Sequence, residues 1–448
     1  MIFAFLLLAG MTDWVPVHWP SGEPKTLDLL TGTSFNCVLV DGEKLNQPFI
    51  DAAALRGIAS TALIRPNANA AEQARRAEQL HVQAIVFEGD FTGDLRSGLA
   101  TPVIELPSRQ KVRLETPDAI LGSWQGLWPG IVIEHGGKVM AGPSSNPWIN
   151  TNTGFLRFLR ADTDSAVWLS VSPPENTVIP PERYGVAIAD AAAAGARWIV
   201  TLDEDLATRL LKGEAHALAD WKRINSYASY FERHRDWREF RPFSRLALTQ
   251  DSDSGGLLSA SLLDLMYAQH IATKAIPPTR LTAASLSGVR TLINVAPPDR
   301  LDGIQKNALA SFTESGGSLI SPPAGWRFGA DAPGSVSPGK QQLARIQDIW
   351  EMLYNATARQ NFGARTFNTA GILFNVLTSP DNKRLLIHLV NYTGFAGDAI
   401  TVQALGKWKR ARLFQPGVPV REIPVYAVKD GTGLDIDKLD VTATLLLE

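Results

Sequence analysis

The sequence is short of cysteine and histidine, and each shortage excludes a class of site. Cys37 is the single cysteine among 448 residues, so neither an internal disulfide nor a cysteine-based zinc site can form. This cysteine lies in an apolar, strand-like run, which favours a buried structural thiol over a nucleophile. The seven histidines are scattered without the close pairing that is typical of metal sites. We therefore predict no metal site.

The chain also has almost no net charge and lacks the glycine-rich motifs that bind phosphates. A formal charge of −2 gives no reason to expect nucleic acid or an anionic membrane surface as a partner. The glycine-rich stretches match neither the Walker spacing nor a dinucleotide fingerprint, and we expect no cofactor. The apolar start, MIFAFLLLAG, is too short to span a bilayer. It favours an atypical export signal, hence a periplasmic or extracellular protein, with a cytoplasmic one as the alternative.

What the sequence does contain is a soluble α/β composition and a regular series of apolar runs. Hydrophobic residues make up 45 % of the chain and charged residues 20 %, as in ordinary globular proteins. Eight short strand-like runs alternate with helix-compatible segments between residues 14 and 238, which predicts a (β/α)8 TIM barrel. The runs are VPVHW, FNCVLVD, STALIRP, AIVFEG, PVIELPS, AILGSWQG, AVWLSVSP and RWIVTLDE.

Two smaller units are predicted after the barrel. Strands and helices alternate at βαβ lengths over residues 239–335, which predicts a flavodoxin-like α/β domain. A helical linker is expected over 336–370. Alternating strands broken by turns over 371–448 predict a small antiparallel β-sandwich.

This order of domains resembles that of the family 42 β-galactosidases and related glycoside hydrolases. The stretches that carry the resemblance are HRDWREFRPFSRLALTQD (234–251), FTESGGSLISPP (312–323) and RLLIHLVNYTG (384–394). The resemblance implies a glycoside hydrolase with a carbohydrate substrate, and a middle domain of the glutamine-amidotransferase type that can form homo-oligomer contacts. That domain has no cysteine here, so it cannot hydrolyse glutamine.

The chain departs from the family pattern at the positions that matter for catalysis. The family places an Asn-Glu pair after strand four, where Glu is the acid/base, and a nucleophilic Glu after strand seven. Glu88 matches the first Glu, but Phe87 stands where the Asn is expected. The run that closes strand seven, Ser170 to Pro173, contains no acid.

Glycoside hydrolysis needs two carboxyl groups across the scissile bond, and several acids close predicted strands. Glu88 is the first candidate for general acid/base; its structural alternative is an ion pair with Arg65 on the neighbouring strand. Asp203 and Glu105 compete for the partner role, and either can instead cap a helix or join an ion pair. Burial beside apolar walls is the means by which one such carboxyl group could keep its proton.

Aromatic and amide side chains near the strand ends are candidates for binding the sugar. Tryptophan stacks on sugar rings, while histidine, amides and charged groups bind hydroxyls. Alternatively, His18 is an ordinary strand-end histidine, and the Asn-rich segment from residue 146 to 154 is a turn that caps the next helix. The predicted binding residues are His18, Trp19, Asp41, Arg65, Trp124, Gln125, Trp128, Asn150 and Asn152.

Two functions remain open at this point. The first is a glycoside hydrolase that acts on an oligosaccharide or glycoside through carboxylates at one face of the barrel. The second is a catalytically inactive carbohydrate-binding or assembly protein on the same scaffold, which the missing acid after strand seven favours.

Overall fold

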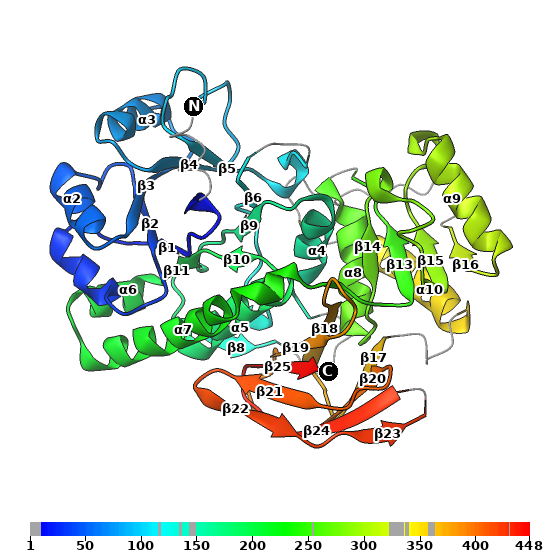
Figure 1. The fold of residues 1–448 in the computed structure, drawn as a ribbon. Coiled ribbons are helices and arrows are strands. Elements are labelled where there is room, and N and C mark those ends of the chain that lie inside the picture. The colour runs from blue at the N-terminus through cyan, green and yellow to red at the C-terminus, as the bar shows by residue number, and fades with distance from the viewer. Residues whose placement is uncertain are drawn as a thin grey trace.

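Three groups of elements can be followed along the chain in Figure 1, which shows a computed structural model. A curled sheet with its helices, in blue to green, is followed by a smaller α/β group in green to yellow and by antiparallel sheets in orange and red. The structure describes residues 10–114, 118–133, 137–142, 149–252, 255–321, 336, 340–356, 363–429 and 431–448. Residues 1–9, which make up most of the predicted export signal, lie outside these ranges. Within the described ranges, no helix is long and apolar enough to cross a membrane.

The first group is built on a curled parallel sheet. Its six strands are paired in the order β11 (Val200–Thr201), β1 (Pro16–His18), β2 (Cys37–Asp41), β3 (Ala59–Ile64), β4 (Ala84–Glu88) and β5 (Val103–Leu106). A three-stranded parallel sheet continues it in the order β10 (Arg197–Trp198), β9 (Ala166–Leu169) and β6 (Ile120–Ser123). The two sheets are joined because β10 and β11 are parts of one run on either side of Ile199.

All eight predicted runs form strands. In the described residues, β5 and β6 are not paired by a ladder of backbone hydrogen bonds. Between β5 and β6, the backbone N–H of Trp124 donates to the Pro107 carbonyl at 3.2 Å, and the Ser123 hydroxyl donates to the same oxygen at 2.8 Å. A curled parallel sheet is therefore established, whereas the closed barrel remains a prediction. A short antiparallel pair, β7 (Ile131–Ile133) and β8 (Val139–Ala141), follows β6.

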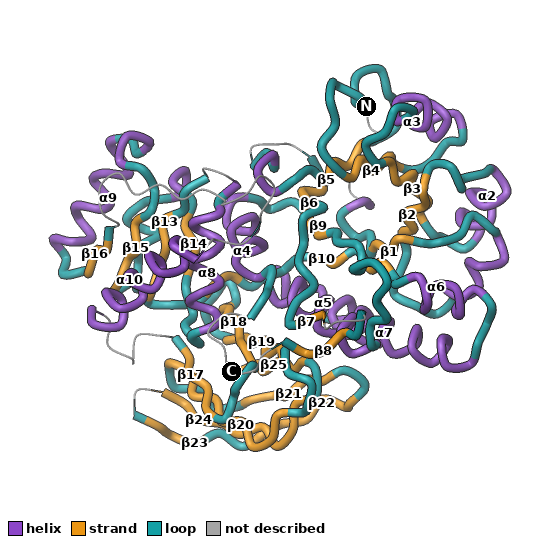
Figure 2. Tube along the Cα trace, turned by 180° about the vertical axis from the view of Figure 1, so that it is seen from behind, coloured by secondary structure: helices purple, strands orange, loops and turns teal. Residues whose placement is uncertain are grey.

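Helices cover the outer face of this sheet, as Figure 2 shows from behind. They are α2 (Gln47–Leu55), α3 (Ala70–Gln79), α4 (Thr153–Asp162), α5 (Pro181–Ala193), α6 (Glu204–Leu211) and α7 (Ala215–Arg233). Sequence signals explain them: Asn46 caps α2 by accepting from the Phe49 N–H, and α3 buries one stripe of alanines under a charged outer face. Helix α7 ends at Arg233, and the 3-10 helix η3 (Arg235–Glu239) follows after His234.

Apolar side chains of alternate strand residues fill the inside of the curled sheet. Cys37 and Leu39 of β2, Val86 of β4 and Trp168 of β9 belong to one buried cluster. Gly122 of β6 keeps this interior tight, since a Cβ there would lie 2.3 Å from a Leu106 methyl carbon. Cys37 is the buried structural thiol that the sequence predicts, and burial raises its pKa. Because strand side chains alternate, the residues two further along these strands also face inward.

The second group is a four-stranded parallel sheet with flanking helices. Its strand order is β14 (Lys274–Ile276), β13 (Leu246–Thr249), β15 (Thr291–Asn294) and β16 (Ser318–Ile320). The helices are α8 (Leu257–Ala268), α9 (Gly303–Glu314) and α10 (Lys340–Ala356). A reciprocal capping box between Asp302 and Gln305 starts α9. The predicted βαβ alternation is present, and the amidotransferase-like assignment stays a prediction.

The third group consists of two antiparallel sheets around one hydrophobic core. The larger sheet pairs β12 (Arg241–Pro242), β18 (Ile372–Thr378), β19 (Leu385–Asn391), β25 (Thr442–Leu447), β21 (Ala411–Gln415) and β22 (Val418–Ile423). The smaller sheet pairs β17 (Ala364–Phe367), β20 (Gly397–Leu405), β24 (Gly431–Leu439) and β23 (Tyr426–Val428). Two of these strands, β12 and β17, come from before residue 371, where the sequence places the start of this unit.

Candidate functional site

Five polar side chains meet at the carboxyl ends of the parallel strands. His18, Asp41 and Glu88 are the last residues of β1, β2 and β4, and Arg65 directly follows β3. The fifth, Ser170, directly follows β9. We call these five residues the mouth network. Parallel α/β sheets carry their binding sites at this end of the strands, because loops and strand ends converge there.

Arg65 links the two acids of the mouth network. Its Nε donates to Glu88 Oε2 at 2.6 Å, and its Nη1 donates to Asp41 Oδ1 at 3.1 Å. His18 Nε2 lies 3.2 Å from the same oxygen of Asp41, and Lys44 Nζ lies 3.0 Å from the other one. The ion pair between Glu88 and Arg65, which the sequence offers as the structural alternative for Glu88, is thus present.

The environment of Asp41 favours its ionised form. Burial acts to raise the pKa of this carboxyl group, but the hydrogen bond and charge of His18, followed by those of Lys44, hold the pKa well below its usual range. The side chain is still 27 % exposed, so it can be reached from the solvent.

Glu88 lies deeper and receives hydrogen bonds on both carboxylate oxygens. It is 8 % exposed, with Arg65 on Oε2 and the Ser170 hydroxyl on Oε1. The contact with Ser170 connects β4 with β9, two strands that belong to different sheets. Gly89 follows at φ 128°, where a Cβ would lie 2.6 Å from the Pro66 ring, so the chain turns away directly after Glu88.

The other two predicted catalytic acids are not brought to Glu88 by the recorded contacts. Asp203 is 2 % exposed and caps α6: Oδ1 accepts from the Leu206 N–H at 3.0 Å, and Oδ2 accepts from the Tyr184 hydroxyl at 2.8 Å. Glu105 lies between Ile104 and Leu106, both of which belong to the inner cluster, so its side chain faces the other side of β5.

Among the predicted aromatic contacts, two are part of the core and one is exposed. Trp19 is fully buried, donates to the Thr26 hydroxyl and packs against Trp221. Trp128 is 6 % exposed, and its Nε1 donates to the Ser172 carbonyl. Trp124, directly after β6, is 38 % exposed and keeps a face available to a ligand.

The predicted amide residues lie beside a buried arginine that the sequence did not indicate. Arg109 donates to the Gln125 backbone carbonyl at 2.7 Å and to Asn152 Oδ1 at 3.1 Å. Its guanidinium lies 4.3 Å from the centre of the Phe155 ring, and burial lowers its pKa to about 10. Asn152 also donates to Asp190, whereas Asn150 is exposed and its carbonyl accepts from Gly130. Gln125 and Asn152 therefore hold the loop after β6.

Ser170 and Lys44 are the members of this region that sequence reasoning missed. Ser170 could have been predicted from the alternation of side chains along a strand, since it lies two residues after the inward-facing Trp168 on β9. In the described part of the chain, no group of three His, Cys, Asp or Glu side chains is arranged to hold a metal ion.

Comparisons with known proteins bear on the fold. No family model matches the chain, and no curated protein is similar to it in sequence. Among solved structures, α-L-fucosidase isoenzyme 2 from Paenibacillus thiaminolyticus superposes with a TM-score of 0.63 at 12 % identity, over 97 % of this chain and 99 % of that one. A rhamnosidase from Novosphingobium sp. PP1Y gives 0.45 at 12 % identity, over 90 % of this chain and 39 % of that one. The chain therefore shares the fold of this fucosidase.

Proposed function

We propose that this protein is a glycoside hydrolase whose active site is the mouth network. The observation that carries the proposal is the pair of acids, Asp41 and Glu88, which flank the guanidinium of Arg65 at the carboxyl ends of β2 and β4, on either side of β3. Both acids lie at the position where barrel enzymes carry their chemistry. The exposed Trp124 supports a sugar substrate, since its ring can stack on a pyranose face.

In this proposal Glu88 is the general acid/base and Asp41 is the ionised partner. The hydrogen bonds of Asp203 suit a helix cap, and the side of β5 that Glu105 occupies is the outer one, so Asp41 takes the partner role. An acid role for Glu88 requires a substrate oxygen to take the place of Arg65 at Oε2. Arg65 can move aside because its side chain is 43 % exposed.

We infer that the parallel strands form a (β/α)8 barrel with a seam between β5 and β6, and that the chain is related to the family 42 glycoside hydrolases. An amidotransferase-like middle domain and a C-terminal β-sandwich complete this assignment. It is supported by the strand order of each group and by the fold shared with a fucosidase.

The test is hydrolysis of a panel of aryl glycosides that includes α-L-fucosides and β-D-galactosides. We expect Glu88→Gln to lower kcat/KM by about 10²–10⁴-fold on 4-methoxyphenyl glycosides, because their poor leaving group needs a proton. The loss is expected to be small on 2,4-dinitrophenyl glycosides, whose leaving group needs none. Equal losses on both substrates would exclude Glu88 as the acid.

Glu105→Gln, the matched change on the neighbouring strand β5, is the control. We expect it to leave kcat/KM unchanged on both substrates. If it instead shows the leaving-group dependence expected of Glu88→Gln, the acid role belongs to Glu105. Circular dichroism of both variants checks that each is folded.

A second function, carbohydrate binding without catalysis, is favoured by one observation. The position after β9 carries Ser170, whose hydroxyl donates to Glu88, and no acid stands there. If the purified wild-type protein turns over none of the glycosides yet binds one of the sugars in calorimetry, this second function is the correct one.

A further inference from the structure

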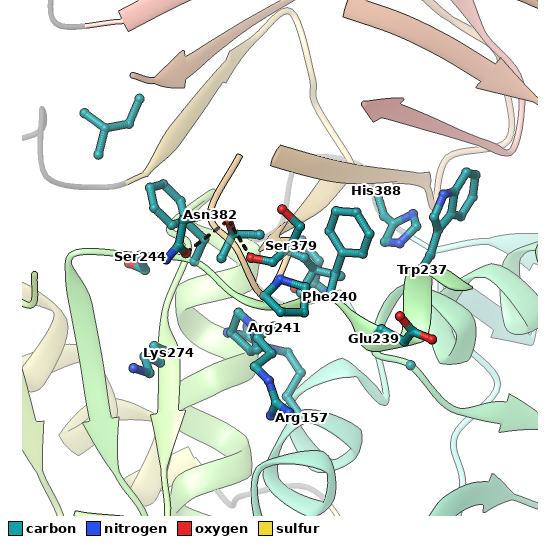
Figure 3. A pocket seen from close by; sticks show the side chains of 18 of the residues that line it. Arg157, Trp237, Glu239, Phe240, Arg241, Ser244, Lys274, Ser379, Asn382 and His388 are labelled. Atoms are coloured by element: carbon teal, nitrogen blue, oxygen red, sulfur yellow. Dashed lines mark hydrogen bonds between the residues drawn. The ribbon is translucent and has the colours of Figure 1, made fainter. Parts of the chain in front are cut away.

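A large cavity lies away from the mouth network, between the three groups of elements. Its volume is about 1970 Å³, and it is lined by parts of α4, α5 and η3, by β14 and by strands and loops of the two antiparallel sheets. Figure 3 shows lining side chains that come from all three groups, among them Arg157, Lys274 and Asn382. None of the five mouth residues lines it. The cavity is therefore a separate site.

The lining of this cavity is strongly cationic, although the chain as a whole carries a net charge of −2. Eight of its lining residues are Lys or Arg, whereas only Asp164 and Glu239 among them are acidic. Cavities lined by one sign of charge focus the electrostatic field and concentrate ions of the opposite sign. The arrangement favours an anionic ligand.

Four arginines form the centre of this charge: Arg160, Arg238, Arg241 and Arg280. All four line the cavity. Burial lowers the pKa of Arg160; the charge of Asp164 opposes this effect, and repulsion from the other three arginines adds to it. Like charges gathered without matching acids destabilise a protein unless a ligand offsets them.

The carboxylates of this region compensate only part of the charge. Arg238 is paired with Glu232, with Nη1 at 3.2 Å from Oε2. Arg280 is 3.8 Å from Asp164 in a loose, exposed pair. No ion pair of Arg241 is recorded within the described residues, and its side chain is exposed. Arg241 and Arg280 thus retain the capacity to bind an incoming anion.

Aromatic side chains line the same cavity on the side of the antiparallel sheets. Trp408 is half-buried, with its indole N–H donating to the Leu405 carbonyl, and the ring of Tyr426 is 42 % exposed. Such flat faces beside cations suit a sugar ring that carries negative groups, because the ring stacks while its anions meet guanidinium groups. A lone inorganic anion would use the arginines but not the aromatic faces.

We propose that this interdomain cavity binds an anionic oligosaccharide, whose carboxylate or sulfate groups are held by Arg241 and Arg280 and whose rings lie against Trp408 and Tyr426. The site contains none of the groups assigned to hydrolysis. It serves to hold a charged glycan chain on the enzyme rather than to cleave it.

The experiment is isothermal titration calorimetry of the full chain with tetragalacturonate, with a sulfated oligosaccharide of the same length, and with fully methyl-esterified tetragalacturonate. We expect one or both of the charged oligosaccharides to bind at least tenfold more tightly than the uncharged ester. Binding of the charged ligand is expected to weaken as sodium chloride is raised from 50 to 500 mM. Sodium sulfate alone tests whether a bare anion suffices.

The double variant Arg241→Ala/Arg280→Ala is expected to lose tenfold or more in affinity for the charged oligosaccharide. The matched control, Arg75→Ala/Arg113→Ala, removes the same charge from exposed residues that do not line the cavity, and it is expected to bind like the wild type. Trp408→Ala reports on stacking independently of charge. No binding of either charged oligosaccharide, equal binding of the ester, equal binding of sulfate alone, or equal losses in both double variants would overturn the proposal.

Discussion

Two networks of buried or half-buried acids in this molecule shift the pKa values of their carboxyl groups in opposite directions. In the mouth network, Asp41 is partly exposed and surrounded by cationic partners, so its pKa is lowered. Between α4, α5 and α8, Asp190 is fully buried, Asp264 is half-buried, and both are bound mainly by neutral donors, so burial raises both pKa values. Charged partners and water keep a carboxylate available for chemistry, whereas burial among hydroxyl and amide donors makes it structural.

The second set of acids, which we call the junction network, fastens the groups of elements together. Asp190 of α5 accepts from the Asn152 side chain at 2.9 Å, from the Thr153 hydroxyl at 3.1 Å and from the Tyr392 hydroxyl at 2.7 Å. Tyr392 directly follows β19, so this one carboxylate connects the curled-sheet helices with the antiparallel sheets. Its role is packing and orientation.

The largest effect is expected from removing the centre of the junction network. Asp190→Ala leaves several buried donors without an acceptor, and we expect the free energy of unfolding to fall by about 2–4 kcal/mol. Urea denaturation followed by circular dichroism measures this change. The control, Asp51→Ala on the exposed face of α2, is expected to change stability by less than about 0.5 kcal/mol. Equal changes in both variants would show that the network is dispensable.

The two networks are expected to affect the pH dependence of stability in opposite directions. Burial raises the pKa of Asp264 to about 7, above the value of about 3.9 for an unfolded aspartate. The folded state then binds the proton more tightly, so stability falls as pH rises from about 4 to 7. We expect Asp264→Asn to flatten this slope, which reaches at most about 1.4 kcal/mol per pH unit. An unchanged slope would contradict the assignment.

Asp41 is expected to show the reverse dependence with a smaller size. Its folded pKa is lowered, so its contribution to stability is present above the unfolded pKa of about 3.9 and is lost as pH falls through that region. The site is partly exposed, and Asp41→Asn should cost no more than about 1 kcal/mol at pH 7. Thermal unfolding at pH 7 and pH 3 checks this: the difference between variant and wild type should shrink at pH 3. A difference that grows instead would refute the pairing.

The sequence located the strands well because apolar runs and alternation are local properties. Each of the eight runs became a strand, and four of the five members of the mouth network were predicted as candidate site residues. The faces of the strands were harder to predict. A curled sheet is apolar on both sides, so the pattern around Glu105 does not say that Ile104 and Leu106 point inward.

Asp203 and the tryptophans show what local patterns leave open. An acid at a strand end that is followed by a helix fits both a catalytic role and a cap, and the hydrogen bonds of Asp203 suit the cap. Trp19 and Trp128 lie near strand ends, where tryptophans can stack on a sugar ring, but helices pack over both of them. Only Trp124 keeps an exposed face.

What the sequence determined by itself is therefore the order of strands, the buried thiol of Cys37 and the row of polar residues that closes β1 to β4. The tertiary structure alone decided which of those residues meet, because Ser170 and Glu88 are 82 positions apart in the chain. It also decided the cationic cavity, whose arginines come from three separate segments and carry no common motif. The physical reason is the same in both cases: hydrogen bonds and charges act across space, while sequence patterns report only on neighbours along the chain.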